Sequence, residues 1–496
     1  MSRPRTAACA LLLALAACST TPRRSVERLA LLPFENLTGD ASLDWIASAA
    51  PSIVAAEITG AANILTVRVE TVRDAYLNRA TRFVHGYFTH RGAGLHFQIE
   101  IEDSARHKMV AAQAADGNLL FAMNDVARKF APGARPFSTA NQDAVAAWGR
   151  GEFARAVTLD PDFGTAWMYW AEQLAGSGKQ AEAGAVAARA LSRPSLRTPA
   201  DRAQLELISA TIDKNVAGRN AALTALVGMS PNDLSLLSAL AETETLARRF
   251  SASAGLYRRI LDIDPGNAVA LNSLGYAEAN AGHLDAAAKA LEQYGKSLDQ
   301  STNSLDSLGE VYFMNGHFAE AERYFQQAYR RDPRFLAGST LMKAAYAHWL
   351  GGDLAGADAI FQRYRDDRMN QKDATAIWRE ATWLYATGRR EQAIAKLMEA
   401  SGDQPPLVQR QLAVWRGEIQ APQDLSTLKK LYDAAVPPND GEFRTFYAAA
   451  LAAAGNKSEA SALLQRWPLP DSGGDPLFQS LVYPEFMELR RALGIK

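Results

Sequence analysis

The stretch NSLDSLGEVYFMNGHFAEAERYFQQAYRRDP, residues 303–333, contains two short segments in which apolar residues recur every three or four positions. Such spacing places the apolar residues on one face of an α-helix, so we predict two amphipathic helices. Gly316 lies between the two segments, and glycine ends a helix at low cost because it tolerates a positive φ. Pro333 follows the second segment and cannot continue a helix. The stretch therefore predicts two antiparallel helices joined by a tight turn.

The same pattern recurs at a fixed spacing along the chain. In residues 303–333 the positions that define it are Leu305, Leu308, Gly309, Tyr312, Ala321, Phe325, Ala328 and Pro333. Matching residues lie 34 positions earlier, at Leu271, Leu274, Gly275, Ala287 and Leu291. Small residues at four of these sites would let the two helices of a pair approach closely. One pair cannot bury its apolar face alone, so we expect neighbouring pairs to stack into a superhelix.

These residues resemble the tetratricopeptide repeat, which favours Trp, Leu, Gly, Tyr, Ala, Phe, Ala and Pro at the eight positions named above; seven of them match. The resemblance implies an all-α superhelix, an α-solenoid. Further copies such as EATWLYATGRREQAIAKLMEA (380–400) extend it over residues 138–467, with about 8–10 helical pairs. We expect residues 404–440 to form an irregular insertion that is itself helical, and residues 468–496 to form a C-terminal capping helix.

The first helix of each pair forms the concave wall of such a superhelix, and the resemblance implies a groove there for an extended or helical peptide. By spacing, the wall residues are Asn272, Tyr276, Asp306, Glu310, Phe313, Met342, Tyr346, Trp349, Trp378 and Tyr385. Aromatic residues at helical spacing also commonly pack in the core, so both interpretations stay open for each residue. We hypothesise that the aromatic members anchor a partner.

Residues 29–137 show a different pattern, in which short apolar strands alternate with helices. The segment LHFQIEIED (95–103) places Phe97, Ile99 and Ile101 on one face and polar residues on the other, as a half-buried strand does. Together with RFVHGYFTH (82–90) it predicts a hairpin. We therefore predict a multidomain chain, with a small α+β domain ahead of the helical repeats.

Three stretches of this region resemble the TolB amino-terminal-like domain: ALLPFENLTGDASLDWIA (30–47), FVHGYFTHRGAGLHFQIEIED (83–103) and NLLFAMNDVARKFA (118–131). In bacteria this domain often precedes tetratricopeptide repeats. The resemblance brings no catalytic residues with it. The chain lacks the aromatic-acidic pair usually found after the last strand of the family.

The first twenty residues, MSRPRTAACALLLALAACST, combine a basic start with an apolar run of about eleven residues, which is too short to span a bilayer. The end of this run, Leu15-Ala16-Ala17-Cys18, resembles the lipobox of bacterial lipoproteins. We predict a lipoprotein signal peptide at residues 1–17, lipidation of Cys18 and a lipidated tether at residues 18–28. The alternative is an ordinary cleavage site in which Cys18 is only a small residue. Ser19 in place of aspartate favours the outer membrane.

The composition argues against several classes of function. With 53 basic and 54 acidic residues and no cationic cluster, the chain has no surface suited to nucleic acid. His85 and His90 differ by an odd number of residues and would face opposite sides of a strand, so we predict no metal site there. GSGKQ (176–180) lacks the upstream glycine and the hydroxyl residue of a phosphate loop. We predict no catalytic residues, no cofactor and no enzyme activity.

Together these features predict a non-catalytic adaptor of the bacterial cell envelope. It would bind envelope proteins or peptides through the groove and face the periplasm from the outer membrane, anchored through Cys18. The alternative function is a ligand- or protein-sensing accessory of a signalling complex that acts through residues 29–137. An envelope enzyme is a third possibility, and no clustered set of acidic residues supports it.

Overall fold

The computed structural model describes residues 27–59, 64–92, 94–196, 198–298, 301–373, 375–400, 412, 415–416, 421–434, 441–465 and 494. The chain divides into two compact units, Met1–Arg135 and Pro136–Lys496, and each is described by itself. The predicted signal peptide, Cys18 and residues 19–26 of the tether lie outside the described residues. So do most of the segment 404–440 and nearly all of the predicted capping helix 468–496.

The first unit is built on one mixed sheet. Its strands are β1 Glu27–Leu31, β2 Glu35–Asn36, β3 Ile64–Arg68, β4 Arg82–Arg91, β5 Gly94–Asp103 and β6 Lys108–Gly117. The order across the sheet is β3-β1-β4-β5-β6, and β2 pairs with β4. β1 runs parallel to β3 and β4, whereas β4, β5 and β6 form an antiparallel meander. The predicted hairpin is the β4–β5 pair, in which Phe88 lies opposite Phe97.

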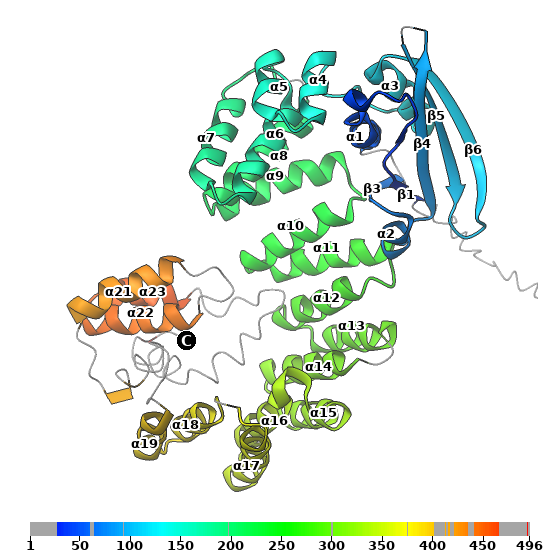
Figure 1. The fold of residues 1–496 in the computed structure, drawn as a ribbon. Helices are drawn as coiled ribbons and strands as arrows, with labels where there is room; N and C mark the ends of the chain where they lie inside the picture. Colours follow the sequence, from blue (N-terminus) through cyan, green and yellow to red (C-terminus); the bar gives the residue numbers. More distant parts are fainter. Residues whose placement is uncertain are drawn as a thin grey trace, which may run out of the picture. The chain divides into compact units, whose positions relative to one another are not determined.

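Alternation along β5 sets which face of the sheet is covered. Phe97, Ile99 and Ile101 are buried as predicted, and the polar residues between them are partly exposed. Helices α1 Ile46–Ile58 and α3 Leu119–Phe130 pack against each other, and the short helix α2 Val72–Leu77 follows β3. Figure 1 shows α1 and α3 on the same side of the sheet. The unit is therefore an α+β domain, and the predicted fold class is confirmed.

The second unit consists of helical pairs that follow one another along the chain (Figure 1). The pairs are α4 Gln142–Gly149 with α5 Phe153–Leu159, α6 Gly164–Gly176 with α7 Gln180–Leu191, α8 Pro199–Ile212 with α9 Val216–Met229, α10 Leu234–Leu246 with α11 Phe250–Ile263, α12 Ala268–Asn280 with α13 Leu284–Ser297, α14 Thr302–Met314 with α15 Phe318–Arg331, α16 Ser339–Leu350 with α17 Leu354–Asn370, α18 Ala376–Ala386 with α19 Arg390–Ala400, and α22 Gly441–Ala453 with α23 Lys457–Gln465. Helix α21 Ala421–Ala434 precedes the last of these pairs.

The small residues of the repeat lie where the two helices of a pair come closest. A Cβ atom placed on Gly275 of α12 would lie 2.5 Å from Cγ of Leu291 in α13. A Cβ atom on Gly309 of α14 would lie 2.5 Å from Cδ1 of Phe325 in α15. Real Cβ atoms do not approach other atoms so closely, so both positions require glycine. The turn glycine Gly316 has a φ of +79°, the left-handed conformation that the sequence predicts.

One connection between pairs departs from the repeat. Between α15 and α16 the residues Leu336 and Ala337 have φ values of +46° and +56°, and Gly338 follows at +74°. These residues form the short helix η2 Phe335–Gly338, and they occupy positions that a regular repeat would already give to the next helix. Helix α14 begins 34 residues after α12, but α16 begins 37 residues after α14. The register of the repeat therefore shifts by three residues at α16.

Candidate partner-binding surface

The ten predicted groove residues lie on the first helices of four consecutive pairs, α12, α14, α16 and α18. Six are buried: Asp306, Glu310, Phe313, Met342, Tyr346 and Tyr385. The other four are partly exposed: Asn272, Tyr276, Trp349 and Trp378. The structure thus places all ten on the expected helices, but only the second set keeps accessible surface, and in Tyr276 the hydroxyl is turned into a buried polar cluster. The reason for the burial differs between the polar and the aromatic residues.

A buried polar cluster joins α12, α14 and α16. The ammonium group of Lys343 donates to Asp306, with Nζ 2.9 Å from Oδ2 and 3.2 Å from Oδ1, and it also contacts the carboxylate of Glu310. The Tyr276 hydroxyl donates to the other carboxylate oxygen of Glu310. Lys343 and Asp306 keep only 4% of their side chains exposed. These groups bind one another across three successive pairs and are not presented to a partner.

Burial also changes the protonation of the cluster. The pKa of Asp306 is raised to about 7. Loss of water is the main cause, Lys343 opposes the rise, and the neighbouring Glu310 adds to it. Burial raises the pKa of Tyr276 well above its usual value, and the neighbouring Glu310 adds to that effect. Removing one partner from such a buried ion cluster is costly because a charge is then left without compensation. The cluster is therefore a structural link between pairs.

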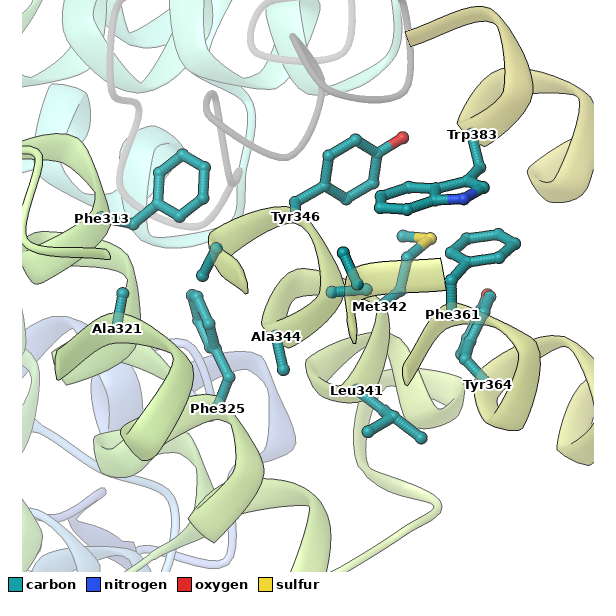
Figure 2. Packing of buried hydrophobic residues seen from close by; sticks show 13 residues of the cluster. Phe313, Ala321, Phe325, Leu341, Met342, Ala344, Tyr346, Phe361, Tyr364 and Trp383 are labelled. Carbon is teal, nitrogen blue, oxygen red and sulfur yellow. The ribbon is translucent and has the colours of Figure 1, made fainter. Parts of the chain in front are cut away.

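The buried aromatic residues form a second cluster, which Figure 2 shows from close by. Tyr346 of α16 meets Trp383 of α18 edge to face, with ring centroids 4.9 Å apart. Phe361 of α17 stacks on the other side of Trp383 at 4.7 Å. Met342 and Phe313 pack in the same cluster. The core interpretation therefore holds for Phe313, Met342 and Tyr346 in this structure, since their neighbours are other helices.

Tyr385 has a separate environment. Its ring stacks on Trp415 with centroids 4.3 Å apart, and both residues belong to a buried cluster with Leu397. A partner could reach Tyr385 only after this stack separates. In the described conformation Tyr385 is therefore covered, and a substitution there would disturb the fold.

Trp349 is the predicted anchor that keeps the best position for a partner. It lies in the last turn of α16 and rests against the edges of Tyr346 and Trp383, with centroid distances of 6.2 and 6.0 Å. The rest of its ring is partly exposed. An aromatic side chain that is fixed by its neighbours and still reaches solvent suits a binding hot spot.

Two residues of these clusters were not among the predicted ones. Lys343 is the fifth residue of α16, as Asp306 is of α14 and Asn272 is of α12. Counting from the start of each helix would have found it, but the start of α16 is displaced by the left-handed turn. Trp383 lies within a recognisable repeat, so its place on a first helix was predictable from the sequence. Its indole Nε1 donates to Asp358 at 2.7 Å within the helical stack, a contact that the repeat pattern does not indicate.

Two of the four histidines of the first unit, His96 and His107, pair with nearby polar groups. His96 Nδ1 lies 2.6 Å from Oδ1 of Asp116, which also accepts from Arg91. His107 Nδ1 lies 3.2 Å from the Tyr76 hydroxyl. Across the described ranges of the chain, no group of three or more His, Cys, Asp or Glu side chains is arranged to hold a metal ion.

Comparison with protein families matches one segment of the stack. Residues 303–335, which include most of α14 and all of α15, match the model of the tetratricopeptide repeat. The chain contains a tetratricopeptide repeat. The match covers the stretch whose spacing predicts the fold, and the helical pairs on either side of it have the same arrangement of a first and a second helix. No curated protein matches the sequence.

Several solved structures show some similarity to the chain. A tetratricopeptide repeat protein from Parabacteroides merdae is 15% identical, with 51% of this chain and 98% of that chain covered and a TM-score of 0.39. Yeast Tom70 is 12% identical, with coverages of 70% and 88% and a TM-score of 0.35. The human IFIT1 dimer with PPP-AAAA is 14% identical, with coverages of 65% and 88% and a TM-score of 0.29. Scores below 0.5 do not establish a shared overall fold.

Proposed function

We propose that the chain is a non-catalytic adaptor of the bacterial cell envelope, which binds partner proteins through the first helices of its repeat stack. The observation that carries this proposal is the continuous series of helical pairs from α4 to α19, with a matched tetratricopeptide repeat inside it. Stacked repeats of this kind present extended surfaces, and such surfaces generally bind other proteins.

The proposed partner surface contains fewer residues than the ten that the sequence predicts, because six of the ten are buried. Trp349 supplies a partly exposed aromatic anchor, and Asn272 is a partly exposed polar member two pairs earlier. Aromatic anchors with polar residues around them fit an extended or helical peptide. The partner would thus be an envelope protein with such a segment.

The envelope part of the proposal rests on the first twenty residues. The basic start, the short apolar run and the sequence Leu15-Ala16-Ala17-Cys18 support export and lipidation, and Ser19 supports the outer membrane. No described helix is both long and apolar enough to cross a bilayer. Acyl chains on Cys18 would provide a firm anchor, because two or more chains are enough for stable attachment. The resemblance of residues 29–137 to the TolB amino-terminal-like domain agrees with this setting.

The proposal is tested by photo-crosslinking in intact cells. A photo-reactive phenylalanine analogue would replace Trp349 in one variant, and Phe121 of the first unit, which is 67% exposed, in a matched control. We expect a protein adduct at position 349 that is absent at position 121. Adding Trp349→Ala to a chain crosslinked from Asn272, which is partly exposed, should weaken the same adduct.

Three outcomes separate the hypotheses. A discrete adduct that depends on Trp349 supports the adaptor. Adducts that form only from the first unit would favour the alternative, a sensing accessory that acts through residues 29–137. Adducts from neither unit would contradict a protein partner. Mass spectrometry of the peptide that begins at Cys18 tests the anchor separately, since a lipidated cysteine has the added mass of its acyl groups.

A further inference from the structure

One end of the first unit exposes apolar and basic side chains together. Because β1, β3 and β4 run in parallel, their starts lie at the same end of the sheet. The start of β4 pairs with the end of β5, and the end of β5 pairs with the start of β6. This end, which we call the tether end, consists of α2, the turns 78–81 and 104–107, and the starts of β1, β4 and β6.

The apolar residues at the tether end are unusually accessible. Leu77 is 72% exposed and Met109 is 60% exposed. Tyr76 and Val110 are also exposed, and Tyr76 is held in place by its ring contact with Phe83 at 5.0 Å and by its hydroxyl beside His107. Side chains of this kind lose contact with water favourably when they meet an apolar layer.

Basic residues accompany this apolar surface. Arg79, Arg106 and Lys108 are exposed in the two turns and at the start of β6. Acidic groups nearby are engaged within the unit. Glu27 pairs with Arg82 at 2.6 Å, and Asp103 accepts hydrogen bonds from the backbone of the turn 104–107.

The opposite end of the sheet exposes several carboxylates, together with the basic Arg68 and Arg91 and the apolar Leu37. The exposed carboxylates Glu35, Asp40 and Asp44 lie around β2 and the helix η1 Ala41–Leu43. Leu37 bonds to the backbone of Phe88, six residues along β4 from its start. At about 3.3 Å per residue this places Leu37 roughly 20 Å from the tether end. Leu37 and its neighbours are therefore too far from the tether end to take part in a contact made there, and they can serve as controls.

The chain connection brings the predicted anchor to the basic and apolar end. β1 begins at Glu27, and residues 19–26 are all that separates it from Cys18. Nine steps of an extended chain reach at most about 30 Å. A lipid on Cys18 would thus hold the tether end close to a bilayer surface, where interfacial aromatic and aliphatic side chains and cations bind anionic headgroups.

We propose that the tether end of the first unit docks onto the anionic lipid surface in which Cys18 is anchored. The inference rests on the lipid anchor of the proposed function and adds a second contact with the membrane. Leu77 and Met109 enter the interface with Tyr76, and Arg79, Arg106 and Lys108 lie against the headgroup phosphates. Docking fixes the direction of the strands relative to the bilayer and turns the opposite end away from it.

The test supplies the anchor chemically. Cys9 precedes Cys18 and the sequence has no further cysteine, so the chain from residue 18 onward can be coupled through its one thiol to a maleimide lipid. The coupled protein is placed on vesicles of phosphatidylcholine alone or with about 30 mol% phosphatidylglycerol. Hydroxyl-radical oxidation of Tyr76 and Met109 is then compared with that of Phe121 near the other end.

We expect Tyr76 and Met109 to be oxidised several times more slowly on the anionic vesicles and Phe121 to be unaffected. Three cations at an anionic surface predict roughly a hundredfold stronger docking than on neutral lipid. Replacing Arg79, Arg106 and Lys108 together by Gln should abolish the protection. Leu77→Ser with Met109→Ser should weaken it, read at Tyr76. Leu37→Ser, a matched exposed leucine at the other end, should leave it unchanged.

Several results would overturn the inference. Equal oxidation of Tyr76 on both vesicle types would contradict docking and leave the lipid anchor standing. Protection that also occurs in solution without vesicles would assign the surface to a second copy of the chain. Protection of Phe121 instead would reverse the orientation. An unmodified Cys18 in cells would remove both the anchor and the docking.

Discussion

The close approach of α14 and α15 can be tested with one methyl group. In Gly309→Ala the new Cβ would lie 2.5 Å from Cδ1 and Cε1 of Phe325, whose side chain is 1% exposed and cannot move aside into solvent. Overpacking of this kind costs about 1–3 kcal/mol. Alanine is favoured over glycine within a helix by about 0.5–1 kcal/mol. The expected net effect is therefore destabilisation of up to about 2 kcal/mol.

Gly255 provides the matched control. It lies in the interior of α11 as Gly309 lies in the interior of α14, but a Cβ at Gly255 would meet no atom within 4 Å. Gly255→Ala should therefore stabilise the protein by about 0.5–1 kcal/mol through helix propensity alone. The difference between the two variants isolates the overpacking, about 1–3 kcal/mol.

Urea denaturation followed by circular dichroism gives the overall effect of each substitution. Stacked repeats need not unfold as one cooperative unit, so hydrogen exchange should be measured as well. Peptides from α14 and α15 should exchange faster in Gly309→Ala, and peptides from α6 and α7 should be unchanged. If Gly309→Ala and Gly255→Ala had the same denaturation midpoint and the same exchange, the packing argument would be refuted.

Three further predictions concern buried and paired charges. Lys343→Met should destabilise the protein by about 3–5 kcal/mol, since it takes the cation away from two buried carboxylates. Adding Asp306→Asn and Glu310→Gln should recover most of the loss in urea titrations, and an additive loss would contradict the ion cluster. The change in the free energy of unfolding caused by Asp306→Asn alone should be more favourable to the folded state at about pH 8 than at about pH 5. The pKa of Asp306 is raised from 3.8 to about 7 on folding, so the folded carboxyl holds its proton more tightly than the unfolded one. The stability of the protein therefore falls as the pH rises between these two values. An effect of Asp306→Asn that did not depend on pH would exclude this reasoning. His348 has a raised pKa, chiefly because it bonds to the carboxylate of Glu322, and its contribution is complete below the unfolded value of 6.5 and lost as the pH rises through the folded value. His348→Gln should thus cost more stability at about pH 5.5 than at about pH 8.5 in thermal melts, and the opposite order would show that the charged form is not the stabilising one.

The fold could be predicted from sequence because repeats reuse the same packing contacts. Each pair must bury the same face against its neighbours, so Gly275 and Gly309 recur at the same spacing as the large residues they face. Alternation along β5 likewise fixes which residues face the core, as Phe97 shows. Both patterns arise from contacts that are local or strictly periodic, and a single sequence displays them directly.

Burial of the groove residues could not be predicted in the same way. Helical spacing shows which side of a helix a residue occupies, but burial depends on what lies against that side. Tyr346 was predicted on the wall as Trp349 was, yet it is covered by Trp383 of α18, which lies 37 positions later in the chain. The sequence places His283 just after a turn glycine, where an exposed side chain is expected. It does not indicate that Nδ1 of His283 lies 2.9 Å from the carboxylate of the buried Glu278.

The left-handed turn at Leu336 and Ala337 explains why the polar cluster was missed. Residues other than glycine rarely adopt positive φ, so neither residue signals the turn in the sequence. When positions are counted from the first residue of each helix, the fifth residues of α12, α14 and α16 are Asn272, Asp306 and Lys343. Asp306 and Lys343, two of the four residues of the polar cluster, therefore form a ladder, in which one position of two successive pairs carries an acid and then a base.

The ladder has a consequence for how the stack can bind a partner. The fifth position of a first helix would ordinarily be available to a ligand, but here an acid and a base at adjacent steps satisfy each other and are sealed by Phe325, whose ring lies 5.7 Å from Lys343 Nζ. A partner that competed for Asp306 would have to break its buried ion pair with Lys343, which would keep its contact with Glu310, and the cost of breaking that pair disfavours recognition at this step. A partner must therefore be recognised by residues outside the ladder. Trp349 lies six residues after Lys343 in α16 and is partly exposed, so it is placed to make such a contact.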